Sequence, residues 1–197
     1  MSMIIAGPSG SGKTVFVRNL VETSKLFDTK FFEVIWCYSV WQDFYSSINA
    51  RFIEGLPEIC EFDGTPKLLI LDDLMHEADD RVGKLFTKYS HHKNVSVIYI
   101  TQNMFHQKKG SRDLSLNAHY LVIFKNPRDK AQIQYLARQL CPENPKFLQE
   151  AYTDATEKAH GYLVIDMKQQ TEDHLRYLTN IFDRPTFYVS TKNYKYK

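Results

Sequence analysis

The stretch that decides the fold is Gly7-Pro8-Ser9-Gly10-Ser11-Gly12-Lys13-Thr14, which matches the pattern G-x-x-x-x-G-K-[ST] at every defined position. An apolar strand, Met3–Ala6, is predicted directly before it. A helix from about Lys13 to Phe27 is predicted after it, because apolar residues recur there at helical spacing. This strand–loop–helix context favours a phosphate-binding loop over an ordinary glycine-rich turn.

The chemistry of such a loop depends on each part of the pattern. Glycines let the backbone turn tightly and bring its N–H groups against phosphate oxygens. The helix that follows directs its N-terminus at the same oxygens. In this arrangement Lys13 neutralises the β- and γ-phosphates, and the hydroxyl of Thr14 is a ligand for Mg²⁺. The loop therefore predicts a site for a nucleoside triphosphate with magnesium.

A second part of the site is predicted at Leu68-Leu69-Ile70-Leu71-Asp72-Asp73. A strand that is apolar on both faces lies in the middle of a parallel sheet, where ligands bind at the carboxyl ends of the strands. Asp72 suits an outer-sphere ligand of magnesium, and Asp73 suits the carboxylate that orients and deprotonates an attacking water. The alternative is that the two acids cap a helix or face solvent. Asp73 also departs from the glutamate common at this position in motor ATPases, and because aspartate is one methylene shorter it has to approach the water more closely.

Gln102 and Asn103 follow the apolar strand Val95–Thr101 as Asp72 follows its own strand. A polar side chain at this point can contact both the γ-phosphate and the attacking water, and so sense hydrolysis. Gln102 is the better candidate, because it lies nearest to the strand end. An amide at a strand end is otherwise a common turn residue.

Short apolar runs alternate with segments of helical period, which predicts an α/β domain of three layers with a mostly parallel central sheet. Further strands are expected at 32–38, 120–124, 161–166 and 175–181, the last two as a C-terminal strand pair, with an edge strand or loop at 51–55. Further helices are expected at 41–49, at 79–89, between Pro127 and Pro142, and at 146–157.

The composition excludes several classes of protein. With 43% hydrophobic and 24% charged residues, the chain is neither disordered nor a fibrous repeat. No run reaches the roughly 20 apolar residues needed to cross a bilayer, and the first residues do not read as a secretory signal. The three cysteines, Cys37, Cys60 and Cys141, are too widely spaced for a disulfide framework. We therefore expect a reducing intracellular location and no membrane partner.

Charge is distributed unevenly along the chain. The formal net charge is +2, yet residues 184–197 carry four basic residues and no acid. We therefore divide the chain into a domain at 1–183 and a basic, aromatic C-terminal tail at 184–197. The tail contacts phosphates or a partner, or else is a solvated terminus.

Larger parts of the chain resemble a known family. The stretches GPSGSGKT, LLILDDL, LFTKYSHHKNVSVIYITQNMF, RDLSLNAHYLVIFKNPRD and GYLVIDM together resemble viral DNA-packaging ATPases of the FtsK–HerA superfamily. The resemblance is strongest to those of Polinton-like elements and adintoviruses, and more distant to poxvirus-type ATPases. It covers about Ile4 to Ile181. The spacing of Lys13, Asp72 and Gln102 also resembles the additional-strand catalytic division of P-loop NTPases.

The resemblance implies an ATP-hydrolysing motor domain that forms a homo-oligomeric ring, a pentamer or hexamer, and moves double-stranded DNA into a viral capsid at its portal vertex. The preference for ATP over GTP rests on the resemblance alone. In such rings an arginine of one subunit reaches the γ-phosphate held by its neighbour. Arg112 is the first candidate and Arg128 and Arg81 are alternatives, although an exposed arginine also makes ordinary surface ion pairs. The place of action is the host cytoplasm or nucleus, where virions assemble.

The DNA contacts of such a motor are independent of sequence, as phosphate neutralisation by basic side chains provides. Lys108, Lys109 and Arg112 are candidates for this contact, and a solvated loop explains them equally well. Two other functions stay open. One is a small P-loop kinase acting on a metabolite, which predicts an arginine-rich lid that is not evident. The other is a nucleotide-dependent scaffold or switch, which has no need of Asp73.

Overall fold

The computed structural model describes residues 1–57, 63–74, 94–103 and 117–191. Its strands are β1 (Ser2–Ala6), β2 (Glu33–Tyr38), β3 (Arg51–Glu54), β4 (Lys67–Asp72), β5 (Val95–Thr101), β6 (Tyr120–Phe124), β7 (Tyr162–Asp166), β8 (Tyr177–Thr179) and β9 (Thr186–Tyr188). Its α-helices are α1 (Lys13–Glu22), α5 (Ala131–Leu140) and α6 (Pro145–Ala155). Short 3₁₀ helices are η1 (Ser24–Leu26), η2 (Asp43–Ser47) and η5 (Asp173–Leu175).

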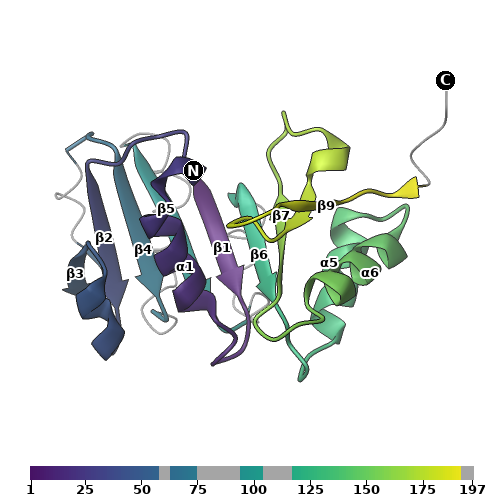
Figure 1. Cartoon of the computed structure of the whole chain (residues 1–197), viewed down its shortest axis with the longest axis horizontal. Coiled ribbons are helices and arrows are strands. Elements are labelled where there is room, and N and C mark those ends of the chain that lie inside the picture. Colours follow the sequence, from purple (N-terminus) through teal and green to yellow (C-terminus); the bar gives the residue numbers. More distant parts are fainter. Residues whose placement is uncertain (58–62, 75–93, 104–116, 192–197) are drawn as a thin grey trace.

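All nine strands form one sheet in the order β3-β2-β4-β5-β1-β6-β7-β8-β9 (Figure 1). The pairs from β3 to β6 are parallel, and β7, β8 and β9 are added antiparallel. The expected mostly parallel sheet with a C-terminal strand pair is therefore confirmed. Strand β9, which extends this pair, lies within the segment predicted as a tail.

The order of the strands positions the site. Strand β5 lies between β1 and β4, with Ala6 opposite Thr101 and Asp72 opposite Ile100. The parallel strands all end at the lower edge in Figure 1. The segments that follow β1, β4, β5 and β6 therefore meet there, because parallel strands bring their carboxyl ends to the same edge.

The core lies on both faces of the central strands, and every residue of β1, β4 and β5 is buried. One face packs against α1 through Phe16, Val17 and Leu20. The other packs against α5 and α6 through residues that include Leu136 and Leu148. This gives the three layers that the sequence predicts, since only strands covered on both faces are apolar throughout.

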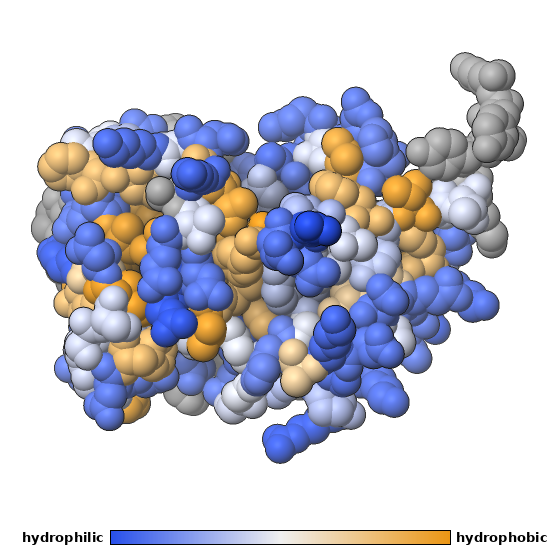
Figure 2. Space-filling view, viewed as in Figure 1, coloured by the Kyte–Doolittle hydropathy of each residue, from blue (hydrophilic) through white to orange (hydrophobic). Residues whose placement is uncertain are grey.

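Helix α1 is the only α-helix that the described part of the chain places on its face of the sheet. Apolar side chains gather on both sides of it in Figure 2, which shows this face. Exposed apolar residues include Val15 on the helix, and Phe32 and Trp41 at the two ends of β2.

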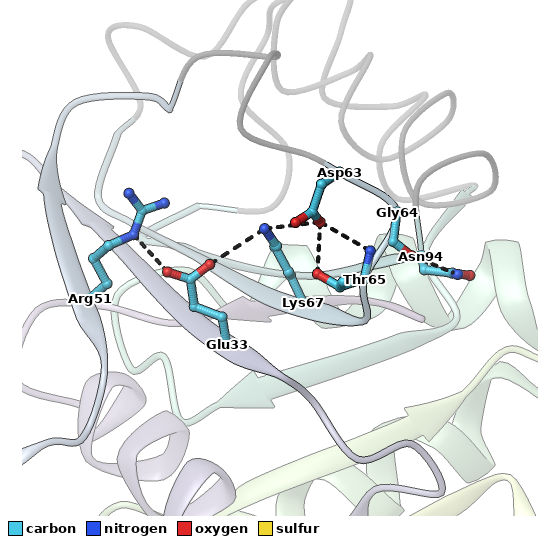
Figure 3. A network of polar contacts seen from close by, with 7 residues as sticks. All are labelled: Glu33, Arg51, Asp63, Gly64, Thr65, Lys67 and Asn94. Atoms are coloured by element: carbon cyan, nitrogen blue, oxygen red, sulfur yellow. Dashed lines mark hydrogen bonds and ion pairs between the residues drawn. The ribbon is translucent and has the colours of Figure 1, made fainter.

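A network of charged side chains joins the amino ends of β2, β3 and β4, at the edge opposite the glycine-rich loop (Figure 3). Lys67 is buried, and its ammonium lies 3.1 Å from Asp63 Oδ1 and 3.5 Å from Glu33 Oε2. Glu33 also forms an ion pair with Arg51, whose Nε lies 2.8 Å from Glu33 Oε1. Thr65 donates two hydrogen bonds to Asp63, from its backbone N–H and from its hydroxyl. A buried ammonium is costly unless it is paired, so this network anchors the far end of the sheet.

Two predicted helices differ from those observed. Helix α1 ends at Glu22, five residues before the predicted end, and the chain continues as the 3₁₀ turn η1. The expected helix at 41–49 is the 3₁₀ helix η2, which buries only Tyr45. Leu26 in η1 is exposed and η2 buries a single residue, so neither segment has the continuous buried face that stabilises a longer α-helix. The helix predicted at 79–89 lies outside the described residues.

No helix in the described ranges is long and apolar enough to span a membrane.

Candidate active site

The loop from Gly7 to Thr14 has the geometry that its glycines allow. Gly10 and Gly12 have φ angles of +76° and +100°, values that side chains other than glycine rarely adopt. Gly7 has no room for a side chain: a Cβ there would lie 2.7 Å from the Cβ of Phe124 and 2.9 Å from Ser11 Oγ. The backbone thus favours glycine at positions 10 and 12, and the packing leaves room only for glycine at position 7.

Lys13 begins α1, and its ammonium lies over the loop. It is buried and donates hydrogen bonds to the carbonyl oxygens of Gly7 at 2.7 Å and Pro8 at 2.9 Å. Burial lowers the pKa of Lys13, and the negative charges of Asp72 and Asp73 act in the opposite direction. A positive charge is therefore held beside the loop, facing the two carboxylates.

Polar groups in the loop fit a phosphate ligand. No side chain caps the N-terminus of α1, where Gly12 is the N-cap, and the first amides of an α-helix have no partner within the helix. Ser11 Oγ is buried and has no hydrogen-bond partner among the described residues. Ser9 is exposed and Thr14 half-buried, so both lie at the surface of the loop. These unpaired donors around a lysine are the groups that bind phosphate oxygens.

Asp72 and Asp73 follow each other at the end of β4 but have different environments. Asp72 is 4% exposed, and its Oδ2 accepts a 2.9 Å hydrogen bond from the hydroxyl of Tyr45. Burial raises the pKa of Asp72, and the hydrogen bond from Tyr45 opposes that shift. Asp73 is exposed, and its φ of +54° turns the chain sharply after the strand. One carboxylate is thus fixed and the other accessible.

Gln102 lies beside Asp73. Its Nε2 is 3.3 Å from Asp73 Oδ2 and 3.5 Å from Oδ1, so the tips of β5 and β4 are in contact. Asn103 instead accepts a 2.8 Å hydrogen bond from the amide of Gln132, on α5. Of the two amides predicted at this strand end, the structure brings only Gln102 to the aspartates.

Magnesium in proteins is usually held by one or two carboxylates together with phosphate oxygens and water. The described residues include no group of three or more histidines, cysteines or acids that could hold a metal ion. The hydroxyl of Thr14 and the carboxylate of Asp72 fit an ion that is shared with a bound triphosphate.

Two residues of the site were not predicted. Tyr45 comes from η2 and bonds to Asp72. His160, in the turn between α6 and β7, lies with Nδ1 3.1 Å from the carbonyl oxygen of Ser11. It has a φ of +60°, and a Cβ on Gly12 would lie 3.3 Å from its ring. Neither residue belongs to a motif, and His160 is 149 positions away from Ser11 in the chain.

Of the three arginines predicted as candidates for the neighbouring subunit's site, only Arg128 lies among the described residues. Arg128 is exposed in the segment after β6, at the same edge of the sheet as the loop. Asn126 Oδ1 accepts hydrogen bonds from the backbone N–H groups of Arg128 and Asp129, and these bonds stabilise the turn. Arg112, Arg81, Lys108 and Lys109 lie outside the described residues.

The fold is similar to that of solved viral proteins. The genome packaging NTPase B204 from Sulfolobus turreted icosahedral virus 2, in complex with sulfate, has a TM-score of 0.59 and 12% identity, over 86% of this chain and 92% of that chain. The complex of the same protein with ATP-gammaS has the same TM-score and identity, and the match covers 95% of this chain and 96% of that chain. B204, the DNA-packaging ATPase from Sulfolobus turreted icosahedral virus, also has a TM-score of 0.59 and 12% identity, over 86% and 94%.

At this identity the similarity shows the fold. The chain therefore has the α/β fold of these packaging NTPases, with a mostly parallel sheet and antiparallel C-terminal strands. No family model matches the chain, and no curated protein matches it significantly in sequence.

Proposed function

We propose that this chain is a P-loop ATPase that acts as the motor of viral DNA packaging. The observation that carries the proposal is the meeting of Lys13, Asp72, Asp73 and Gln102 at one edge of a parallel sheet. The first three interact electrostatically, and Gln102 contacts Asp73. Solved structures with the same fold are named as packaging NTPases, one of them in complex with ATP-gammaS.

The triphosphate is held by groups that the structure places around the loop. The amides of residues 10–14 and the ammonium of Lys13 bind the β- and γ-phosphates, with Ser11 Oγ as a further donor. Thr14 and Asp72 would hold magnesium, which when bound would supply positive charge to the phosphate oxygens. Thr14 lies in the first turn of α1 and Asp72 at the end of β4, so the site is complete only in the folded domain.

Hydrolysis is the in-line attack of water on the γ-phosphorus. The water oxygen forms a bond to phosphorus while the bond to the β–γ bridging oxygen breaks, giving ADP and phosphate. Asp73, exposed and free to approach, orients the water and takes its proton. Gln102 contacts both carboxylate oxygens of Asp73 and is placed to respond when the γ-phosphate leaves.

The motor forms a homo-oligomeric ring around double-stranded DNA at the portal vertex of a capsid. An arginine supplied by the neighbouring subunit stabilises the transferred phosphoryl group, with Arg112 as first candidate and Arg128 and Arg81 as alternatives. Lys108 and Lys109 contact DNA phosphates without reading sequence, and Arg112 joins them where Arg128 or Arg81 supplies the arginine to the neighbouring subunit. Packaging takes place in the host cytoplasm or nucleus.

The experiment that tests the proposal measures ATP hydrolysis with and without long duplex DNA, over a range of protein concentrations. A packaging motor is stimulated by DNA of any sequence, and its specific activity rises steeply as rings assemble. A specific rate of hydrolysis that changes neither with DNA nor with protein concentration would refute the motor function. Absence of Mg-ATP binding in calorimetry would refute the nucleotide site as well.

A further inference from the structure

We infer that Tyr45 is a positioning residue that holds the carboxylate of Asp72 in the orientation needed to bind magnesium. This inference rests on the proposed nucleotide site. The juxtaposition that carries it is the 2.9 Å hydrogen bond from the Tyr45 hydroxyl to Asp72 Oδ2, formed between two side chains that are 1% and 4% exposed.

The hydroxyl of Tyr45 is directed at Asp72 by its own partners. The amide of Gln42 donates to the Tyr45 oxygen at 3.3 Å, so the hydroxyl proton is left for Asp72. Gln42, Tyr45 and Asp72 thus form a directed chain, in which each hydrogen bond strengthens the next.

The ring of Tyr45 is locked by aromatic packing. Its centroid is 5.2 Å from the ring of Phe52, on β3, in a stacked arrangement, and 5.5 Å from the ring of Trp36, on β2. Trp41 and Phe44 pack against it edge to face, at 5.5 Å and 4.8 Å. A side chain held on all these sides has little rotational freedom, so its hydroxyl is a rigid anchor for Asp72.

The physical effect follows from how metal ligands are oriented. A carboxylate that is free to rotate must be ordered when the ion binds, whereas one already hydrogen-bonded in place loses less entropy at that step. Removing such a partner behind a metal ligand commonly weakens metal binding by about 10- to 100-fold. The Tyr45 hydroxyl donates to Asp72, so it acts through that carboxylate.

The test compares Tyr45→Phe with wild type in two measurements. One is the Mg²⁺ concentration that gives half-maximal ATP hydrolysis. The other is binding of ATPγS by calorimetry, with Mg²⁺ or with EDTA. We expect the Mg²⁺ requirement to rise about 10-fold and Mg-dependent binding to weaken similarly, while binding in EDTA stays at the wild-type level. An unchanged Mg²⁺ requirement, or equal weakening with and without Mg²⁺, would overturn the inference.

A matched control is Tyr188→Phe. It removes the same kind of contact, a 2.7 Å hydrogen bond from a tyrosine hydroxyl to the carboxylate of Asp154, at the C-terminal strands. Its Mg²⁺ requirement should equal that of wild type. If wild type shows no Mg-nucleotide binding, the proposed function is wrong. If wild type binds Mg-nucleotide and Tyr45→Phe has the same Mg²⁺ requirement, the proposed function stands and this inference is wrong.

A double variant separates positioning from folding. Tyr45→Phe leaves the buried carboxylate of Asp72 without its donor, which lowers stability, whereas Tyr45→Phe combined with Asp72→Ala removes both partners. If Tyr45 acts through Asp72, the double variant binds Mg-ATPγS no more weakly than Asp72→Ala alone. A further loss of at least 10-fold in the double variant would show that Tyr45 acts by another route.

Discussion

Replacing Gly7 with alanine tests the geometry of the phosphate loop. The added Cβ would lie 2.7 Å from the Cβ of Phe124, about 0.7 Å short of the 3.4 Å at which ordinary contact begins. The Cβ of Phe124 is fixed to the backbone of β6, so the loop itself has to move. We expect the free energy of unfolding to fall by about 1–3 kcal/mol. A fall of about 2 kcal/mol corresponds to a melting temperature lower by about 4–8 °C in a domain of this size.

The displaced loop should also bind nucleotide more weakly. A shift approaching 1 Å at a reacting or binding group costs on the order of 10- to 100-fold, so ATPγS affinity measured by calorimetry should fall at least 10-fold. Gly64→Ala is the control. Gly64 has a φ of +92°, and a Cβ added there would have no atom within 4 Å, so alanine adds backbone strain far from the loop.

Gly64→Ala should therefore lower the melting temperature without changing nucleotide affinity. If Gly7→Ala retains both the melting temperature and the ATPγS affinity of wild type, the inference that the loop lies too close to β6 for a side chain at position 7 is wrong. Equal loss of affinity in the two variants would show that general destabilisation, and not the position of the loop, weakens binding.

Three further predictions concern catalysis and the sheet. Asp73→Asn should lower ATP turnover by at least 100-fold while calorimetry still detects ATP binding, because the amide orients water but takes no proton; wild-type turnover would reject Asp73 as the base. Arg112→Ala should be inactive alone but regain activity when mixed with Asp73→Asn subunits, because each supplies what the other lacks; no rescue would remove Arg112 from the trans role. Hydrogen bonds from Thr65 and the ion pair with Lys67 lower the pKa of Asp63, so they stabilise the fold above the usual aspartate pKa of about 4. The melting-temperature difference between wild type and Asp63→Asn should therefore be full at pH 7 and shrink below about pH 4, and a difference that grows on acidification would contradict the network.

The glycine-rich loop and the two strands that end beside it were predictable because their signals are local. The glycines of the loop, the apolar run before Asp72 and the strand before Gln102 each specify their own backbone. Burial on both faces then makes those strands central, and parallel strands bring their ends together. The ends of β4 and β5 meet in the structure, where Gln102 Nε2 lies 3.3 Å from Asp73 Oδ2.

The order of the strands was not predictable in the same way. The strand at 32–38 lies between Lys13 and Asp72 in the sequence, but in the sheet β2 lies on the outer side of β4. The strand between β1 and β4 is β5, which comes after both in the chain. Sequence order and order in the sheet differ because parallel strands are joined by crossovers, and each crossover can lead to either neighbour.

Local pattern thus determined the glycine-rich loop, the apolar strands that end beside it and the parallel sheet that they form, because backbone conformation and apolar spacing are properties of adjacent residues. The contacts of Tyr45 and His160, and the pairing of β9 with β8, emerged only on folding. Each depends on residues distant in sequence meeting at a surface of fixed shape, and no single residue along the chain carries the information for that meeting.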